Sequence, residues 1–210
     1  MSDLRLIGYR YSVYTRAARM GLHLADCVYA YDEVNPFDVD ASQQTGHPLG
    51  RVPVLLIGTA SLYETAAILT WCDATRDWQA TAMVEARAAQ VGGIVDAYGY
   101  WPMVRRVYSH GWFRPAIGEA PDQDEIATGL KASEPVLDML EDIARSGEVL
   151  TGSELTRADC HLAPMIDAFQ RAPEGAEALA KRPTLAGWFD AIKTTDTFTT
   201  TAYGAFPEGP

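Results

Sequence analysis

The chain has 210 residues, of which 48% are hydrophobic, so it can hold one large domain or two small ones around an ordinary globular core. Its net charge of −11 disfavours nucleic acid and anionic membrane surfaces as partners, because both need a basic face. The N-terminus shows no signal-peptide pattern, and no apolar run approaches the ~20 residues that span a bilayer. We therefore expect no membrane association.

The cysteine pattern indicates a reducing compartment. Cys27, Cys72 and Cys160 are odd in number and widely spaced, and no CxxC motif occurs. Secreted disulfide frameworks use an even number of cysteines. We therefore expect free thiols that behave as small core residues, and a cytoplasmic location.

Residues 1 to 75 alternate the patterns of strands and helices. The predicted elements are a strand over 4–8, a helix over 15–25, a strand over 28–34, a loop over 35–48, strands over 54–57 and 61–63, and a helix over 64–74. Gly58-Thr59-Ala60 separates the last two strands and predicts a hairpin. The order β-α-β, then β-β-α, predicts a parallel strand pair joined by a right-handed crossover.

Beyond Arg76 the strand signal disappears. The predicted helices cover 80–110, 125–145, 156–169 and 185–193, and the stretch from 194 onward is expected to fray. Pro102 lies inside the first of these helices and should kink or break it, since proline lacks the N–H of a helical bond. Thr156 and Asp159 form a capping-box pattern at the start of the third helix. The plan is an α/β domain over residues 1–76 followed by an all-helical domain over residues 80–210.

Two short segments carry groups that suit a small peptide ligand. Val52-Pro53 precedes a strand, where an X-Pro bond can leave an unpaired backbone edge for an extended ligand. Glu64-Thr65 begins a helix and offers a carboxylate for an ammonium group, and a hydroxyl with free N–H groups for a carboxylate. A γ-glutamyl end carries both of these groups on one carbon and would fit both at once.

Four motifs, in this order, together resemble the soluble glutathione S-transferases and span nearly the whole chain. They are Ser12-Val13-Tyr14-Thr15, Gly50-Arg51-Val52-Pro53-Val54-Leu55, Tyr63-Glu64-Thr65-Ala66-Ala67-Ile68, and Leu155-Thr156-Arg157-Ala158-Asp159 with Pro164. The run Tyr98-Gly99-Tyr100-Trp101-Pro102-Met103 is similar to a bacterial subgroup of the family. The resemblance implies a thioredoxin-like first domain, a helical second domain, a homodimer, and a cleft that holds glutathione beside an electrophile.

Ser12 occupies the position that, in the family, often faces the glutathione sulfur. A hydroxyl donor and the positive end of a helix favour the thiolate, which is the reactive form of a thiol. A simple N-cap role is the alternative. Tyr9 is the rival donor, because some classes of the family use a tyrosine from the end of the first strand. Relatives often have proline after the serine, where this chain has Val13.

The resemblance also assigns a glutathione-binding set. It consists of Arg51, Val52, Pro53, Glu64 and Thr65. Pro53 would be cis and would present the Val52 backbone to the cysteinyl part of glutathione as an added strand does. Glu64 would bind the γ-glutamyl ammonium and Thr65 its carboxylate. Arg51 would contact the glycine carboxylate, with His47 as a weaker candidate for that end, and an exposed solvated charge is the alternative for both.

The electrophile pocket is expected to be lined by Tyr14, Tyr98, Trp101 and Tyr108, although aromatic residues at helical spacing are more often core or dimer contacts. Thr156 and Asp159 are expected to be structural. The four histidines show no metal-ligand spacing, so we expect no metal.

The sequence thus predicts a glutathione transferase whose thiolate attacks a hydrophobic electrophile or a peroxide, with glutathione as its co-substrate. One alternative is a glutathione-dependent isomerase or dehalogenase on the same scaffold. Another is a non-catalytic binding or regulatory protein with the same fold.

Overall fold

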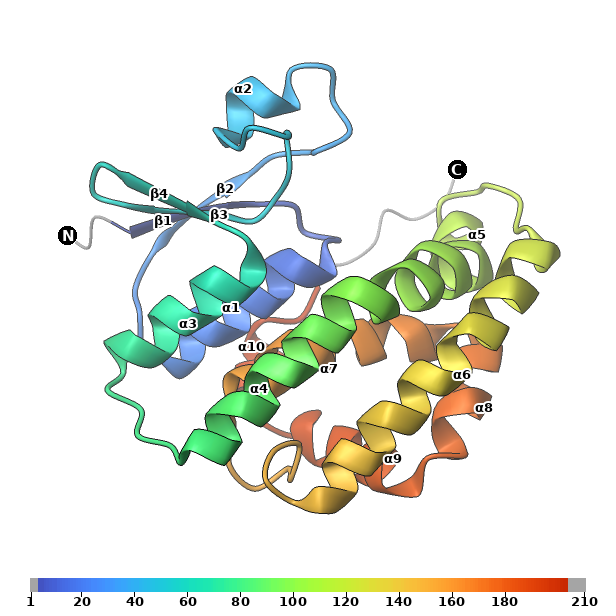
Figure 1. Cartoon of the computed structure of the whole chain (residues 1–210). Coiled ribbons are helices and arrows are strands. Elements are labelled where there is room, and N and C mark those ends of the chain that lie inside the picture. Colours follow the sequence, from blue (N-terminus) through green and yellow to red (C-terminus); the bar gives the residue numbers. More distant parts are fainter. Residues whose placement is uncertain (1–3, 204–210) are drawn as a thin grey trace. The chain divides into compact units, whose positions relative to one another are not determined.

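The computed structural model describes residues 4–203 and divides them into two compact units (Figure 1). Residues 4–79 form the first unit together with 196–203, and residues 80–195 form the second. The sequence had assigned everything from 80 to 210 to the helical domain, whereas 196–203 pack with the first unit. Within the described range, no helix combines the length and apolar character needed to cross a bilayer.

The first unit contains a four-stranded mixed sheet in the order β2-β1-β3-β4. The strands are β1 (Leu4–Gly8), β2 (Ala30–Glu33), β3 (Val54–Ile57) and β4 (Ala60–Tyr63). β1 and β2 are parallel, and β3 pairs antiparallel with both β1 and β4. This is the thioredoxin-like arrangement that the resemblance implies, and it confirms the predicted order of strands.

Helices α1 (Val13–Leu24) and α3 (Thr65–Thr75) pack against each other beside the sheet. The core they share with the sheet consists of Leu6, Ala18, Leu22, Leu55, Ile68 and Cys72. Gly21 permits the close approach of the two helices, because a Cβ at this position would lie 2.5 Å from the Leu69 side chain. The core therefore fixes the ends of β1, β3 and β4 relative to the first residues of both helices.

The described end of the chain completes the first unit. Helix α10 (Asp196–Thr200) packs against α1, where the Arg16 Nη2 donates to the carbonyl oxygen of Phe198 at 3.1 Å. The Arg16 guanidinium also lies 4.0 Å from the centroid of the Phe198 ring. These contacts explain why this segment is ordered rather than frayed: it satisfies an arginine that is only 2% exposed.

The second unit is entirely helical among its described residues. Its elements are α4 (Ala82–Ile94), η1 (Val95–Phe113), α5 (Arg114–Ala116), α6 (Gln123–Ser146), α7 (Arg157–Arg171), α8 (Pro173–Ala180) and α9 (Pro183–Ile192). Helix α7 is buried over nearly its whole length and contacts α4, η1, α8 and α9. The predicted capping box begins it, since the Thr156 hydroxyl accepts from the Ala158 N–H and the Asp159 carboxylate accepts from the Thr156 N–H.

The sequence predicted a kink or a break at Pro102, and the helix does not end there. The chain winds as a π-helix, η1, from Val95 to Phe113, so the change of winding begins seven residues before the proline. A π-helix pairs each N–H with a carbonyl five residues earlier. Pro102 has no N–H to give, so it costs this helix one bond, to Ala97, without ending it.

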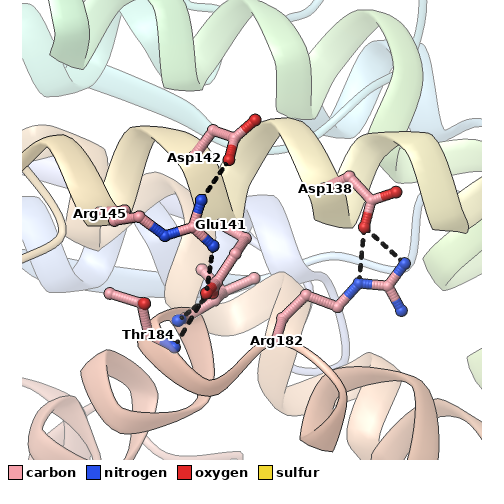
Figure 2. A network of polar contacts seen from close by, with 7 residues as sticks. Asp138, Glu141, Asp142, Arg145, Arg182 and Thr184 are labelled. Carbon is pink, nitrogen blue, oxygen red and sulfur yellow. Dashed lines mark hydrogen bonds and ion pairs between the residues drawn. The ribbon is translucent and has the colours of Figure 1, made fainter.

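Contacts of charged side chains join α6 to α9 and to Arg182, the residue before α9 (Figure 2). The buried Glu141 carboxylate accepts from the backbone N–H groups of Thr184 at 3.2 Å and Leu185 at 2.7 Å. Arg182 donates twice to Asp138 Oδ1, at 2.9 and 2.7 Å. Helix α9 has no cap from its own N-cap residue, so a side chain of α6 satisfies its first N–H groups.

Candidate functional site

The strand register brings the predicted glutathione-binding residues of the first unit to one edge of the sheet. Ile7 near the end of β1 pairs with Val54 at the start of β3, and Val54 pairs with Tyr63 at the end of β4. Neighbouring strands lie about 4.8 Å apart. The residues that follow β1, precede β3 and follow β4 therefore lie at the same end of the sheet: Ser12, Val52, Pro53, Glu64 and Thr65.

Ser12 is the N-cap of α1 and is half-buried. Its hydroxyl oxygen accepts from the Thr15 N–H at 3.2 Å, and its own N–H donates to the Tyr9 carbonyl at 2.9 Å. The capping role is therefore real, but it uses only the oxygen of the hydroxyl. The O–H hydrogen can still be donated to a ligand.

Tyr9 lies in the same corner, and its ring packs against neighbouring rings. The centroids of Tyr11 and Phe37 are 5.3 and 6.1 Å away, both in edge-to-face geometry. Burial raises the pKa of Tyr9, and nearby Tyr11 and Glu33 raise it further. Tyr9 thus keeps its phenolic proton and is chemically able to donate, but the contacts described for its ring belong to an aromatic cluster.

The bond between Val52 and Pro53 is cis, as the resemblance predicts. Gly50, two residues before Val52, has φ +62, a conformation that favours glycine, and a Cβ there would lie 3.3 Å from the Ser42 backbone nitrogen. Arg51 is exposed, and within residues 4–203 no ion-pair partner is shown for it. Its guanidinium is thus available to solvent or to a carboxylate.

Glu64 and Thr65 begin α3 in an arrangement suited to a zwitterion. Glu64 is the N-cap with φ 72 and ψ 120, a sparsely populated conformation for a residue other than glycine. Its side chain is 74% exposed, so its carboxylate can meet an ammonium group. The Glu64 side chain does not cap α3 and the first turn carries no acid, so the N–H groups beside Thr65 suit an anion.

His47 was predicted only as a weaker candidate for the glycine carboxylate. The structure buries its ring and places Nε2 3.6 Å from Oε1 of Glu64. Nothing in the sequence pattern indicates this contact, because the two residues lie on different segments and show no common spacing. The flanking Gly46 and Pro48 were the only local signal, and they indicate a turn.

The predicted electrophile-pocket residues lie in both units. Tyr14 is half-buried on α1 of the first unit. In the second unit, Tyr98 and Trp101 are each 61% exposed on η1, whereas Tyr108 is buried and stacks on Trp112 with a centroid distance of 5.6 Å. Of the three predicted pocket residues on η1, Tyr98 and Trp101 are therefore accessible and Tyr108 is buried within the unit.

The site contains no reactive thiol of the protein's own. Cys27, Cys72 and Cys160 are free, as predicted, and burial raises the pKa of Cys72 to about 12. Across residues 4–203, no cluster of three or more His, Cys, Asp or Glu side chains could hold a metal ion. The residues at this end of the sheet can bind charged groups and donate hydrogen bonds.

Comparisons with known proteins agree with this geometry. The family model for the glutathione S-transferase N-terminal domain matches residues 6–79, and the model for the C-terminal domain matches residues 103–196. The chain is 26% identical over 168 residues to glutathione S-transferase 3 of Zea mays, covering 78% of this chain and 75% of that protein.

Two solved structures share the fold. One is a glutathione S-transferase from Rhodospirillum rubrum F11, with 19% identity, a TM-score of 0.81, and coverage of 99% of this chain and 96% of that one. The other is glutathione S-transferase I from maize in complex with an atrazine glutathione conjugate, with 19% identity, a TM-score of 0.78, and coverage of 95% and 96%. Both domain models of one family match in the expected order, and the residues at the sheet edge lie within the first match, so the chain belongs to the glutathione S-transferase family.

Proposed function

We propose that this transferase binds glutathione along the edge of its sheet and ionises the thiol beside Ser12. The observation that supports the proposal is the register of β1, β3 and β4, because the residues that flank these strands then lie at one end of the sheet. In this arrangement Glu64 holds the γ-glutamyl ammonium and Thr65 with the α3 N–H groups holds its carboxylate. The backbone of the cysteinyl residue binds beside Val52 and Pro53, and Arg51 binds the glycine carboxylate.

The reaction then needs little from the protein beyond ionisation and positioning. The Ser12 O–H donates to the sulfur as its proton leaves to solvent, and the positive end of α1 favours the thiolate. With an aryl halide, the thiolate forms the carbon–sulfur bond and the halide departs. In the first unit Tyr14 is proposed to supply aromatic surface for a hydrophobic electrophile, and in the second unit Tyr98, Trp101 and Tyr108 stay predictions from the resemblance. The complex of maize glutathione S-transferase I with an atrazine glutathione conjugate supports a substrate of this kind.

Two measurements test the function. Calorimetric titration with S-methylglutathione is expected to show binding at one site, and turnover of a generic aryl halide with glutathione is expected to follow. Binding without turnover of any aryl halide or peroxide would leave the non-catalytic alternative standing. Absence of binding at millimolar ligand would refute the proposed site as a whole.

We further propose a cytoplasmic homodimer with a detoxifying role in a bacterium. The free cysteines support a reducing compartment. Exposed apolar side chains of the first unit support a protein contact, and they are Phe37, Val39 and Leu49. The bacterial assignment rests on the resemblance of residues 98–103. Sedimentation equilibrium should give twice the chain mass of 22.9 kDa, and a monomer at micromolar concentration would contradict the dimer.

A further inference from the structure

His47 is held in a fixed orientation in the loop that leads to β3. Its N–H donates to Thr45 Oγ1 at 3.2 Å, and its carbonyl oxygen accepts from the Gly50 N–H at 2.9 Å. The Leu49 N–H donates to the ring nitrogen Nδ1 at 2.9 Å. The Tyr63 ring packs on the imidazole with a centroid distance of 4.8 Å, and His47 is only 4% exposed. These contacts leave the ring little freedom to turn.

The hydrogen bond to Nδ1 decides which nitrogen of His47 carries the hydrogen. A nitrogen that accepts a hydrogen bond holds no proton, so the ring in this arrangement is neutral with its hydrogen on Nε2. Nε2 is the atom that lies 3.6 Å from Glu64 Oε1. This distance slightly exceeds that of a hydrogen bond, so the orienting role described below requires the two atoms to come closer when the ligand is bound.

The backbone of Glu64 is held in one conformation, but its side chain is free to turn. A contact that orients the carboxylate would therefore help it to bind an ammonium group. The residue has φ 72, and its carboxylate does not cap α3. The side chain is 74% exposed, so solvent surrounds most of it. Among residues 4–203, His47 is the ionisable side chain that lies within ion-pair distance of this carboxylate. The buried ring can therefore limit the directions that the exposed carboxylate takes up.

We propose that His47 is a positioning residue that orients the Glu64 carboxylate towards the γ-glutamyl ammonium of glutathione. The inference rests on the proposed function and adds a residue to it. A neutral N–H donor directs the carboxylate without cancelling its negative charge, so the full charge remains for the ammonium. A lysine or arginine at this place would form an ion pair and compete with the ligand.

This role replaces the one that the sequence allowed for His47. A contact with the glycine carboxylate would need a ring nitrogen that is exposed and unoccupied. Nδ1 is already engaged by the Leu49 N–H, and Nε2 faces Glu64. Arg51 is exposed and remains the candidate for the glycine end.

A pair of substitutions separates orientation of Glu64 from support of the loop. His47→Asn keeps an acceptor near the position of Nδ1 and removes the group that reaches Glu64. His47→Gln keeps a donor that reaches Glu64 and loses the acceptor for Leu49. Affinities are measured by calorimetry for S-methylglutathione and for its analogue that lacks the γ-glutamyl amino group.

His47→Asn is expected to weaken S-methylglutathione binding about tenfold, because an oriented charge-assisted contact is lost, and to leave the analogue unchanged. His47→Gln is expected to bind both ligands nearly as the natural protein does. In a Glu64→Gln background, His47→Asn should have no further effect on either ligand. His23→Gln is the matched control, because His23 lies on α1 and contacts Thr197 of α10; it should change neither affinity.

Equal weakening of both ligands by His47→Asn would overturn the proposal in favour of loop support, and so would weakening by His47→Gln alone. If the natural protein binds neither ligand, the proposed function fails together with the inference. If it binds both ligands equally well, only the inference and the role of Glu64 fail. Nitrogen NMR of the natural protein tests the proposal without any substitution. The imidazole hydrogen of His47 is expected on Nε2, and a hydrogen on Nδ1 would overturn the proposal.

Discussion

The Ser12 hydroxyl accepts one hydrogen bond and can donate another. Its oxygen accepts from the Thr15 N–H at 3.2 Å, and its hydrogen is available to the glutathione sulfur. Ser12→Ala removes both contacts. We expect kcat/KM with an aryl halide to fall roughly 10- to 100-fold, because a hydrogen bond to a charged group is worth about 1.5–3 kcal/mol. The pKa of the bound thiol, read from the ultraviolet absorbance of the thiolate, should rise.

The two tasks of Ser12 can be measured apart. Ser12→Thr keeps the cap and the donor, so it should keep most activity. Loss of the cap alone should cost about 1 kcal/mol of unfolding free energy in Ser12→Ala. Tyr9→Phe is the matched comparison and should stay active. Full activity in Ser12→Ala with loss in Tyr9→Phe would make the tyrosine the thiolate donor.

Glu64 combines a binding group with backbone strain. A residue other than glycine at φ 72 costs of the order of 1–3 kcal/mol, and glycine removes that cost while making the unfolded chain more flexible. Glu64→Gly is therefore expected to raise the free energy of unfolding by about 1 kcal/mol. It should also abolish measurable binding of S-methylglutathione. Urea unfolding and calorimetry check the two effects, and a variant that is both less stable and unbound would show that the conformation carries no strain.

At the scale of helices, Glu141 of α6 acts as the cap of α9. Its carboxylate accepts from the Thr184 and Leu185 N–H groups and lies 3.1 Å from Arg145 (Figure 2). Glu141→Gln should lower the free energy of unfolding by about 1–2 kcal/mol at neutral pH, because the helix start loses an anion. Asp142→Asn is the matched control, since Asp142 is exposed and pairs only at the surface with Arg145.

Acid should remove the difference between the natural protein and Glu141→Gln. Burial by itself would raise the pKa of Glu141, but the hydrogen bonds from Leu185 and Thr184 and the charge of Arg145 together hold it below the ordinary 4.5. The stabilisation is complete above that ordinary value and is lost as pH falls through the lower pKa of the folded state. Urea unfolding at neutral pH and below pH 4.5 checks the sign. A difference that grows on acidification would contradict it.

Elements that span at least two periods of their side-chain pattern, two residues per period in a strand and 3.6 in a helix, were predictable. Strands β1 and β3 and helices α1, α3, α6 and α7 carry apolar patterns, β4 follows a hairpin signal, and the structure confirms these elements. Helices α2 (Ala41–Thr45) and α10 were missed because five residues are too few to show a period. Helix α8 was missed although it begins at Pro173, a residue that favours the first helical position.

The candidate site was only partly predictable. Its residue types and their order come from the sequence and its resemblance to the family, but their meeting at one edge depends on strand register. The contact between His47 and Glu64 depends on the loop before β3 approaching the residue that precedes α3, which no local pattern encodes. The winding of η1 was unpredictable for a related reason, since proline predicts a lost bond and not how the chain accommodates the loss.

At the scale of the whole molecule, the first unit is built from two distant segments. Phe198 of α10 is 8% exposed and covers the guanidinium of Arg16 on α1. Phe198→Ala should lower the free energy of unfolding by about 3 kcal/mol, the usual loss for a buried aromatic ring. Hydrogen exchange of the α1 amides should speed up, whereas the α7 amides should change less.

Thr200→Ala is the control for this substitution, because Thr200 is exposed on the same helix. It should leave the exchange of the α1 amides unchanged. Equal acceleration in α1 and α7 would show that the protein opens only as a whole. No acceleration in α1 would show that α10 does not support the first unit.

The two segments of the first unit are far apart in the sequence, and this affects how the unit folds during synthesis. The ribosome releases the sheet, α1 and α3 early, but the segment that covers Arg16 emerges only after all seven helical elements of the second unit described between residues 80 and 195. Until then the nascent chain carries a cation without its aromatic and carbonyl partners. Ribosome-bound chains that stop before residue 196 should therefore hold the thioredoxin-like part in a looser, more protease-sensitive state than chains in which residues 196–203 have left the ribosome.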